Sequence, residues 1–133
     1  MIRASAKWAG QMQFAGTSNS GHSVLMDGES KVASSPMELV LIALCGCTAA
    51  DVVTILQKKR EPLTALEVTV HAEKAPEPPR VYTELKLLYH VSGKVNRKSV
   101  EDAVRLSEEK YCSVAAMLSK TARIAYEIRL ETE

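Results

Sequence analysis

The feature that most constrains the fold of this chain is a long apolar run over residues 36–58. Ser35 is a favoured helix-capping residue, and proline at position 36 suits the first turn of a helix. Cationic residues at 58–60 favour a helix C-terminus, and Pro62 prevents the helix from continuing. The run therefore predicts one helix that begins at Pro36 and ends near residue 58.

This predicted helix is apolar on nearly every side, which allows two interpretations. Its length alone would suit a membrane span. Gly46 and Asp51 in its middle, and the strand-like patterns on both sides of it, favour instead a helix buried inside a protein. A chain of 133 residues can hardly surround such a helix alone, so we expect a second subunit to cover one face.

The segments around the helix alternate between apolar and polar residues, which is typical of half-buried strands. We expect two or three short antiparallel strands within residues 2–28, and a capping box at Ser99–Asp102 that begins a second helical region. Further strands are expected over residues 66–72, 81–91 and 124–130, and a short helix over residues 112–118. This order predicts an α+β fold, with residues 1–133 forming a single domain.

Charge and cysteine content exclude several classes of protein. Lys and Arg number 17 against 16 Asp and Glu, so the chain lacks the basic excess of a nucleic-acid-binding protein. Three cysteines are too few, and odd in number, for a secreted disulfide scaffold. Residues 1–7 contain no apolar segment typical of a signal peptide. We therefore expect a cytoplasmic protein without a membrane anchor.

Cys45, Cys47 and Cys112 are the one unusual set of reactive side chains. At about 100° per residue, Cys45 and Cys47 point some 200° apart on a helix, so both cannot bind one tetrahedral zinc ion. The same angle prevents a disulfide between them, whereas either of them can pair with Cys112 if the fold brings it close. Three buried cysteines acting as small apolar side chains remain the simplest alternative.

The order of the motifs resembles the OsmC/organic hydroperoxide resistance family. Residues 35–39 read Ser-Pro-Met-Glu-Leu at the helix start, Cys47 follows on the helix, and Cys-Ser-Val begins at Cys112, 65 positions later. Ser-Gly-His at 20–22 and Glu-Lys-Tyr-Cys-Ser-Val at 109–114 resemble a less characterised branch of that family. The resemblance covers nearly the whole chain.

This resemblance implies an OsmC-like intertwined homodimer, in which antiparallel sheets enclose the long central helices and paired active sites lie at the interface. It implies that Cys47 is the peroxidatic thiol and Cys112 the resolving thiol, while Cys45 belongs to the core. The implied substrates are an organic hydroperoxide and a small dithiol reductant, with no cofactor and no metal. The alternatives are a dimer that binds a small ligand and a redox sensor.

Two departures from the family pattern concern the groups that activate the thiol. The family has a glutamate after the helix-starting proline, paired with an arginine from the N-terminal strands. Here Met37 follows Pro36, Glu38 is turned about 180° from Cys47, and the corresponding segment 10–13 has no arginine.

Asp51 lies one turn beyond Cys47, where a carboxylate disfavours the thiolate. Such a site needs a cation, and the candidates are Lys7, Arg105 and Lys110. As alternatives, Asp51 accepts a hydrogen bond or a proton, or it belongs to a buried polar network at the dimer interface. His22 is a further candidate for substrate binding, although a solvated turn histidine is the simpler interpretation, and Tyr111 is expected to line the pocket or fill the core.

Overall fold

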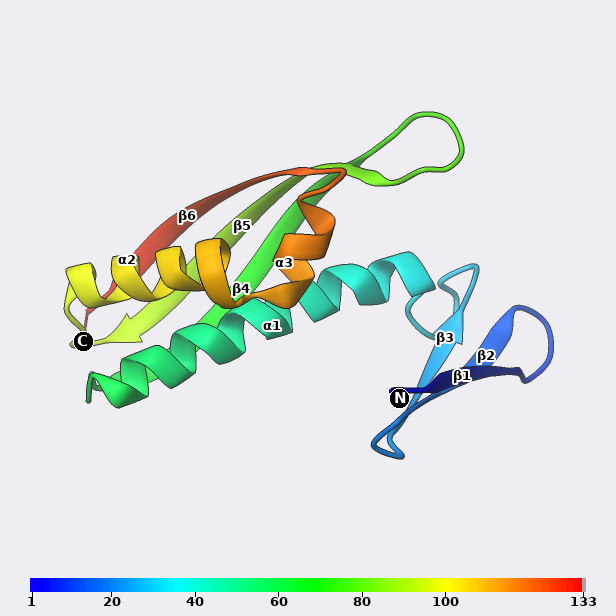
Figure 1. The fold of residues 1–133 in the computed structure, drawn as a ribbon, viewed down its shortest axis with the longest axis horizontal. Coiled ribbons are helices and arrows are strands. Elements are labelled where there is room, and N and C mark those ends of the chain that lie inside the picture. Colours follow the sequence, from blue (N-terminus) through cyan, green and yellow to red (C-terminus); the bar gives the residue numbers. More distant parts are fainter. Residues whose placement is uncertain (133) are drawn as a thin grey trace. The chain divides into compact units, whose positions relative to one another are not determined.

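The computed structural model describes residues 1–132, and the chain divides into two compact units, Met1–Ile42 and Ala43–Glu133. The first unit contains a three-stranded antiparallel sheet, in the order β1 (Ala4–Trp8), β2 (Gln13–Ser18) and β3 (Ser23–Asp27) (Figure 1). These strands confirm the short antiparallel strands expected within residues 2–28.

Helix α1 spans Pro36–Lys58, as the apolar run predicts, and its start is held by a reciprocal pair of hydrogen bonds. The backbone N–H of Glu38 donates to Ser35 Oγ at 3.1 Å, and the backbone N–H of Ser35 donates to Glu38 Oε1 at 2.8 Å. The Ser30 hydroxyl also donates to Glu38 Oε1, at 2.6 Å. This arrangement is a capping box, which supplies partners for backbone N–H groups that have none inside the helix.

The second unit contains a sheet in the order β4 (Leu63–Lys74), β5 (Tyr82–Gly93) and β6 (Arg123–Glu131). Strands β4 and β5 are antiparallel, but β5 and β6 are parallel. The sheet is therefore mixed, which corrects the expectation of purely antiparallel sheets. The physical reason is that a helical segment connects β5 to β6 and carries the chain back to the end where β5 began.

The connection between β5 and β6 consists of α2 (Arg97–Leu106), a π-helical turn η1 (Ser107–Tyr111) and α3 (Ser113–Leu118). Helix α2 begins two residues before the expected capping box, so that expectation is wrong. Asn96 is the cap, because its side chain accepts hydrogen bonds from the backbone N–H groups of Lys98 and Ser99. The Ser99 hydroxyl donates instead to Glu61 Oε2 at 3.0 Å.

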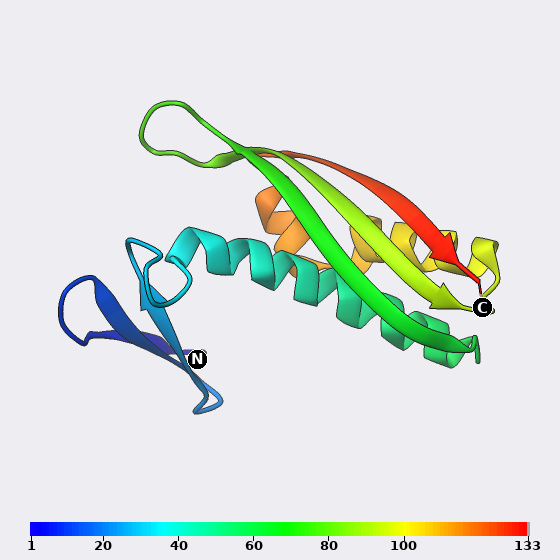
Figure 2. The same ribbon diagram turned by 180° about the vertical axis from the view of Figure 1, so that it is seen from behind.

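The helices of the second unit lie on one face of its sheet, as the two opposite views show (Figures 1 and 2). Strand β5 supplies alternate buried side chains to the core: Leu85, Leu87, Tyr89 and Val91. Helix α1 contributes a stripe at every fourth position: Leu44, Thr48, Val52 and Leu56, all fully buried. This stripe faces the core of the second unit. The core therefore contains a polar group from each of these two elements, at Thr48 of α1 and at Tyr89 of β5.

Helix α1 buries only that stripe within its own chain. Its remaining side chains are half-buried or exposed, and they include apolar residues such as Ile42, which is 56% exposed. By length and composition α1 is also apolar enough to cross a membrane. The apolar surface of α1 that is left open is the main unexplained feature of this fold.

Candidate thiol site and its polar network

Two of the three cysteines come together in the second unit. Cys47 is half-buried on α1, and Cys112 is buried between η1 and α3. Their side chains are within hydrogen-bonding reach of each other, and both are free thiols. Cys45 is a third free thiol, half-buried, and burial raises its pKa. Of the two cysteines on α1, it is therefore Cys47 that lies next to Cys112.

The Cys112 thiol is held in its neutral form. Burial raises its pKa to about 12, and the Cys47 side chain and the charge of Glu108 add to this effect. The backbone N–H of Ala115 donates to Cys112 Sγ at 3.4 Å and lowers the pKa, but by less than burial raises it. Cys112 is therefore a thiol at neutral pH and needs a proton acceptor before it can react as a thiolate.

A chain of hydroxyl and carboxyl groups lies in the same unit. Tyr89 donates to Glu108 Oε1 at 2.6 Å, and the Tyr89 hydroxyl lies 2.6 Å from Thr48 Oγ1. Thr48 Oγ1 is 2.8 Å from Ser107 Oγ, and Ser107 donates to Asp51 Oδ2 at 2.9 Å. We call these five residues the polar chain. It connects α1, β5 and η1.

The π-helical turn places two members of the polar chain. The backbone N–H of Cys112 donates to the carbonyl oxygen of Ser107 at 2.8 Å, five residues back, where an α-helix would have a four-residue spacing. Ser107 and Glu108 begin this wider turn, and Cys112 ends it. The turn therefore positions the buried thiol together with two groups of the polar chain.

Glu108 is a carboxyl group that resists ionisation. Burial raises its pKa, hydrogen bonds from Tyr89 and Thr48 oppose the rise, and the negative charge of Asp51 reinforces it. Burial likewise raises the pKa of Tyr89, and the hydrogen bond to Glu108 raises it further. Tyr89 is consequently a neutral hydrogen-bond donor, and Glu108 is the member of the polar chain best suited to hold a proton.

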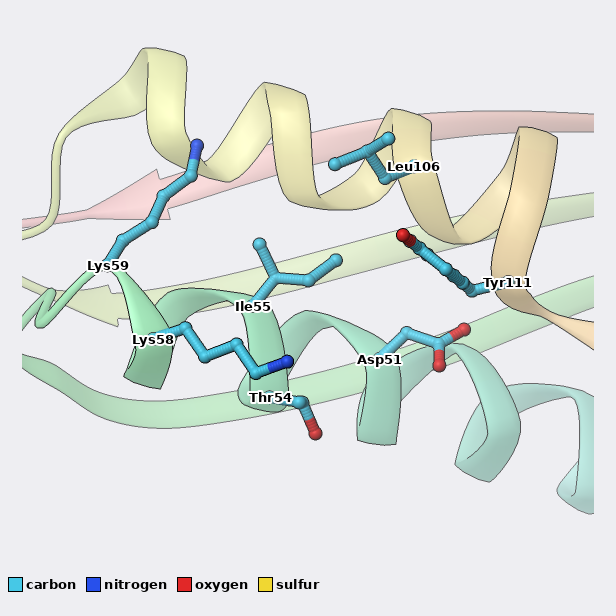
Figure 3. A pocket seen from close by; sticks show the side chains of 7 residues that line it. All are labelled: Asp51, Thr54, Ile55, Lys58, Lys59, Leu106 and Tyr111. Atoms are coloured by element: carbon cyan, nitrogen blue, oxygen red, sulfur yellow. The ribbon is translucent and has the colours of Figure 1, made fainter.

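A cleft of about 430 Å³ is lined by one member of the polar chain, Asp51 (Figure 3). Ile55 of α1 and Leu106 of α2 provide its apolar wall, and Asp51 and Tyr111 lie at one end. Its other lining residues are Thr54, Lys58 and Lys59. Asp51 belongs to both the polar chain and the cleft, so it connects the buried groups to the surface.

The other predicted site residues have varied surroundings. Tyr111 lines the cleft and is 50% exposed, whereas Glu38 caps α1. Lys7 and His22 belong to the first unit. Lys7 is exposed on β1, and the exposed His22 contacts Ser20 Oγ through Nδ1 at 2.9 Å.

The two candidate cations of the second unit are engaged elsewhere. Arg105 lies 3.0 Å from Asp102 and 3.9 Å from Glu109, and the Lys110 ammonium lies over the Tyr111 ring, 5.3 Å from its centre. Within the described part of this unit, residues 43–132, neither Asp51 nor Glu108 forms an ion pair. The two cations therefore pair with groups other than the carboxyl groups of the polar chain.

Across residues 1–132, no group of three or more His, Cys, Asp or Glu side chains is arranged to hold a metal ion.

Sequence reasoning missed four members of the polar chain: Thr48, Tyr89, Ser107 and Glu108. The available signal was a hydroxyl at a buried position of an apolar pattern, as for Tyr89 among Leu85, Leu87 and Val91.

Comparison with known proteins gives a consistent result. Residues 27–127 match the family of OsmC-like proteins. Protein YhfA of Escherichia coli strain K12 is 47% identical over 127 residues, which cover 94% of this chain and 95% of YhfA.

Solved structures share the fold over nearly their full length. A hypothetical protein from Aquifex aeolicus VF5 is 28% identical with a TM-score of 0.91, and the match covers 100% of this chain and 98% of that one. The organic hydroperoxide resistance protein OhrB of Bacillus subtilis is 13% identical with a TM-score of 0.67, and the match covers 97% and 98% of the two chains. This chain belongs to the OsmC-like protein family.

Proposed function

We propose that this chain is a cytoplasmic thiol-based redox protein that reduces organic hydroperoxides with Cys47 and Cys112. The observation that supports the proposal most directly is the contact between these two thiols, which come from separate elements. Membership of the OsmC-like family supports a redox role, and several solved structures of the same fold are organic hydroperoxide resistance proteins.

The proposed reaction consumes both thiols. The Cys47 thiolate attacks the peroxide oxygen, the O–O bond breaks, and the products are a Cys47 sulfenic acid and an alcohol after the alkoxide gains a proton. The Cys112 thiolate then attacks the sulfenic sulfur, so that a disulfide forms and hydroxide leaves as water. A small dithiol reduces the disulfide by exchange and becomes oxidised itself. Two thiols and one hydroperoxide thus give one disulfide, one alcohol and one water.

The decisive experiment counts thiols by mass spectrometry before and after one equivalent of cumene hydroperoxide. We expect a loss of two hydrogens that maps to a Cys47–Cys112 disulfide. The link should be absent in Cys47→Ser and Cys112→Ser, and it should persist in the matched control Cys45→Ser. Three unmodified thiols under excess peroxide would show that the proposed reaction does not occur.

We also propose that the working form is a homodimer, because α1 leaves an apolar surface open. Ala43, Gly46 and Ala50 are exposed along one side of α1, and nothing lies within contact distance of the place where a side chain at Gly46 would be. Small residues let a second helix approach closely. OsmC-like proteins are soluble, which favours a core helix completed by a partner over a membrane span.

Light scattering tests this assembly. Ala50→Arg should convert a dimer into monomer or aggregate, since a charged side chain would enter the covered surface. The matched control is Ala125→Arg, at another exposed alanine, on the polar face of the sheet. A monomeric wild type, or a dimer unaffected by Ala50→Arg, would contradict the proposed interface.

A second candidate function is the binding of a small ligand without turnover. The observation in its favour is that Asp51 and Glu108, rather than a cation, lie near the thiols, while the cleft beside them has an apolar wall. A turnover assay with hydroperoxide and dithiothreitol separates the two functions. Catalytic consumption of peroxide supports the enzyme, whereas unchanged peroxide together with a ligand retained through purification supports the binding protein.

A further inference from the structure

The polar chain contains more short oxygen–oxygen contacts than its hydroxyl groups have protons. Four contacts of 2.6 to 2.9 Å join Glu108, Tyr89, Thr48, Ser107 and Asp51 in that order. Each contact needs one proton between its two oxygens. Tyr, Thr and Ser each carry a single hydroxyl proton, and an ionised carboxylate carries none.

When both carboxyl groups are ionised, one of the contacts of Thr48 lacks a proton. Tyr89 then donates to Glu108, and Ser107 donates to Asp51. Thr48 has one proton, which can fill its contact with Tyr89, its contact with Ser107 or its longer contact with Glu108 Oε1 at 3.4 Å, but only one of the three. At least one pair of oxygens would therefore face each other without a proton at 2.6 or 2.8 Å, which is unfavourable in a buried site.

One additional proton on either carboxyl group removes this conflict. With the proton on Glu108, every group donates toward Asp51; with the proton on Asp51, every group donates toward Glu108. Both arrangements satisfy all four contacts, and they interconvert when each hydroxyl passes its proton to the next oxygen.

We infer that the polar chain holds one proton shared between Glu108 and Asp51 and relays protons to and from the Cys47–Cys112 pair. The relay role rests on the proposed function, whereas the shared proton does not. Thr48 is a positioning residue in this scheme, because it contacts neither sulfur in the proposed reaction and acts by connecting the two halves of the chain.

Each carboxyl end of the polar chain is related to one of the two thiols. Asp51 is four residues beyond Cys47 on α1, hence on the same side of the helix, and it lines the cleft. Glu108 lies close enough to Cys112 for its charge to raise the pKa of that thiol. The thiol protons of Cys47 and Cys112 end on the alkoxide and on the departing hydroxide, and the chain can accept and return each of them.

The surrounding charges agree with one retained proton. Burial and the charge of Asp51 raise the pKa of Glu108, while the hydrogen bonds from Tyr89 and Thr48 lower it. The other titratable groups beside the chain are Cys47, Cys112 and Tyr89, and Tyr111, Lys58 and Lys59 line the cleft with Asp51. The negative charge of Asp51 therefore favours a proton on Glu108.

Infrared spectroscopy of the reduced wild-type protein at neutral pH tests the shared proton directly. We expect a protonated-carboxyl band that shifts in D₂O and that responds to separate carbon-13 labelling of the glutamate and aspartate carboxyl groups. Absence of any protonated carboxyl band at neutral pH would overturn the inference, whether or not the protein reacts with peroxide.

Variants at Thr48 provide a matched pair. Thr48→Val removes the central hydroxyl, so Tyr89 and Ser107 can each satisfy one carboxylate and no extra proton is needed; the band should be lost. Thr48→Ser keeps the hydroxyl and should keep the band. Loss of the band in both variants, or in neither, would contradict a relay through the Thr48 hydroxyl. Circular dichroism confirms that each variant is folded.

The relay itself is tested by the pH dependence of Cys47 alkylation with iodoacetamide, which needs no hydroperoxide. A second unneutralised carboxylate in Thr48→Val should move the midpoint of Cys47 alkylation to higher pH, because a nearby negative charge disfavours the thiolate. Thr48→Ser should restore the wild-type midpoint. Equal midpoints in all three proteins would overturn the relay, whereas a shift without peroxide reduction would leave the relay intact and reject the hydroperoxide substrate.

Discussion

Asp102 and Glu108 are six residues apart on one helical segment, yet their surroundings are opposite. Asp102 is half-buried and lies among three cations, with Arg105 at 3.0 Å, Lys59 at 3.6 Å and Lys98 at 3.8 Å. Burial would raise its pKa, but these cations together lower it. Glu108 lies among hydroxyl groups, and burial raises its pKa.

This difference shows that carboxyl groups are stabilised in two ways within one small unit, by ion pairs and by hydrogen bonds from hydroxyl groups. Ion pairs at the surface neutralise Asp102 in a solvent that already screens it, so they contribute little to stability. The buried hydroxyl groups around the half-buried Glu108 stabilise its carboxyl group without supplying a counter-charge, so each missing hydroxyl has a large effect. Three variants test this contrast, beginning with the largest expected effect.

The largest loss of stability is expected for Tyr89→Phe. The Tyr89 hydroxyl is fully buried and contacts both Glu108 and Thr48, so its removal takes one hydrogen-bond partner from each of them. The free energy of unfolding should fall by about 1–3 kcal/mol in urea denaturation. Tyr126→Phe is the control, since Tyr126 is 43% exposed and contacts Tyr89 edge to face; its change should stay within about 0.5 kcal/mol. Equal losses would contradict a special role for the buried hydroxyl.

A smaller effect is expected on the pH dependence of the free energy of unfolding. Because the pKa of Glu108 is raised in the folded protein, the folded state keeps a proton that the unfolded state has lost as pH rises above 4.5. The wild type should therefore lose stability as pH rises through this window, by linkage. Glu108→Gln has no proton to lose, so its free energy of unfolding should lack that decline. Parallel pH profiles for the two proteins would count against a raised pKa.

Asp102→Asn should have the smallest effect at neutral pH. Its lowered pKa gives the opposite sign to Glu108: its stabilisation is present above the ordinary value of 3.8 and is lost as pH falls toward the lowered value. The variant should therefore show a flatter acid limb of the unfolding profile. Its small loss of stability should fade in high salt, which screens exposed charges. A loss that persists in high salt would show that Asp102 behaves like a buried group.

The local patterns of the sequence predicted much of the fold. Proline and serine at the start of α1, and the cations and Pro62 at its end, set bounds that depend on neighbouring residues only. The alternation in β4, β5 and β6 likewise arises because each strand has one buried face. The start of α2 was placed wrongly because Ser99 and Asn96 both suit a cap, and only the fold shows that Ser99 bonds to Glu61 instead.

The sequence predicted less of the candidate site than of the fold. The resemblance to the family pointed to Cys47 and Cys112, whose contact depends on packing between α1 and the η1–α3 segment. The polar chain joins residues up to 60 positions apart, from Thr48 to Glu108, and each of them alone is an ordinary surface residue type. The parallel pairing of β6 also went unpredicted, because alternation does not encode the direction of a neighbouring strand.

The π-helical turn of Ser107–Tyr111 makes this site sensitive to chain length as well as to composition. Its wider ring includes one residue more than an α-helical turn, and one residue rotates the downstream segment by about 100°. Deletion of a single residue from the turn would leave a regular helix with every helix-forming side chain in place. It would nevertheless turn Cys112 away from Cys47, so a one-residue deletion here should prevent the proposed disulfide.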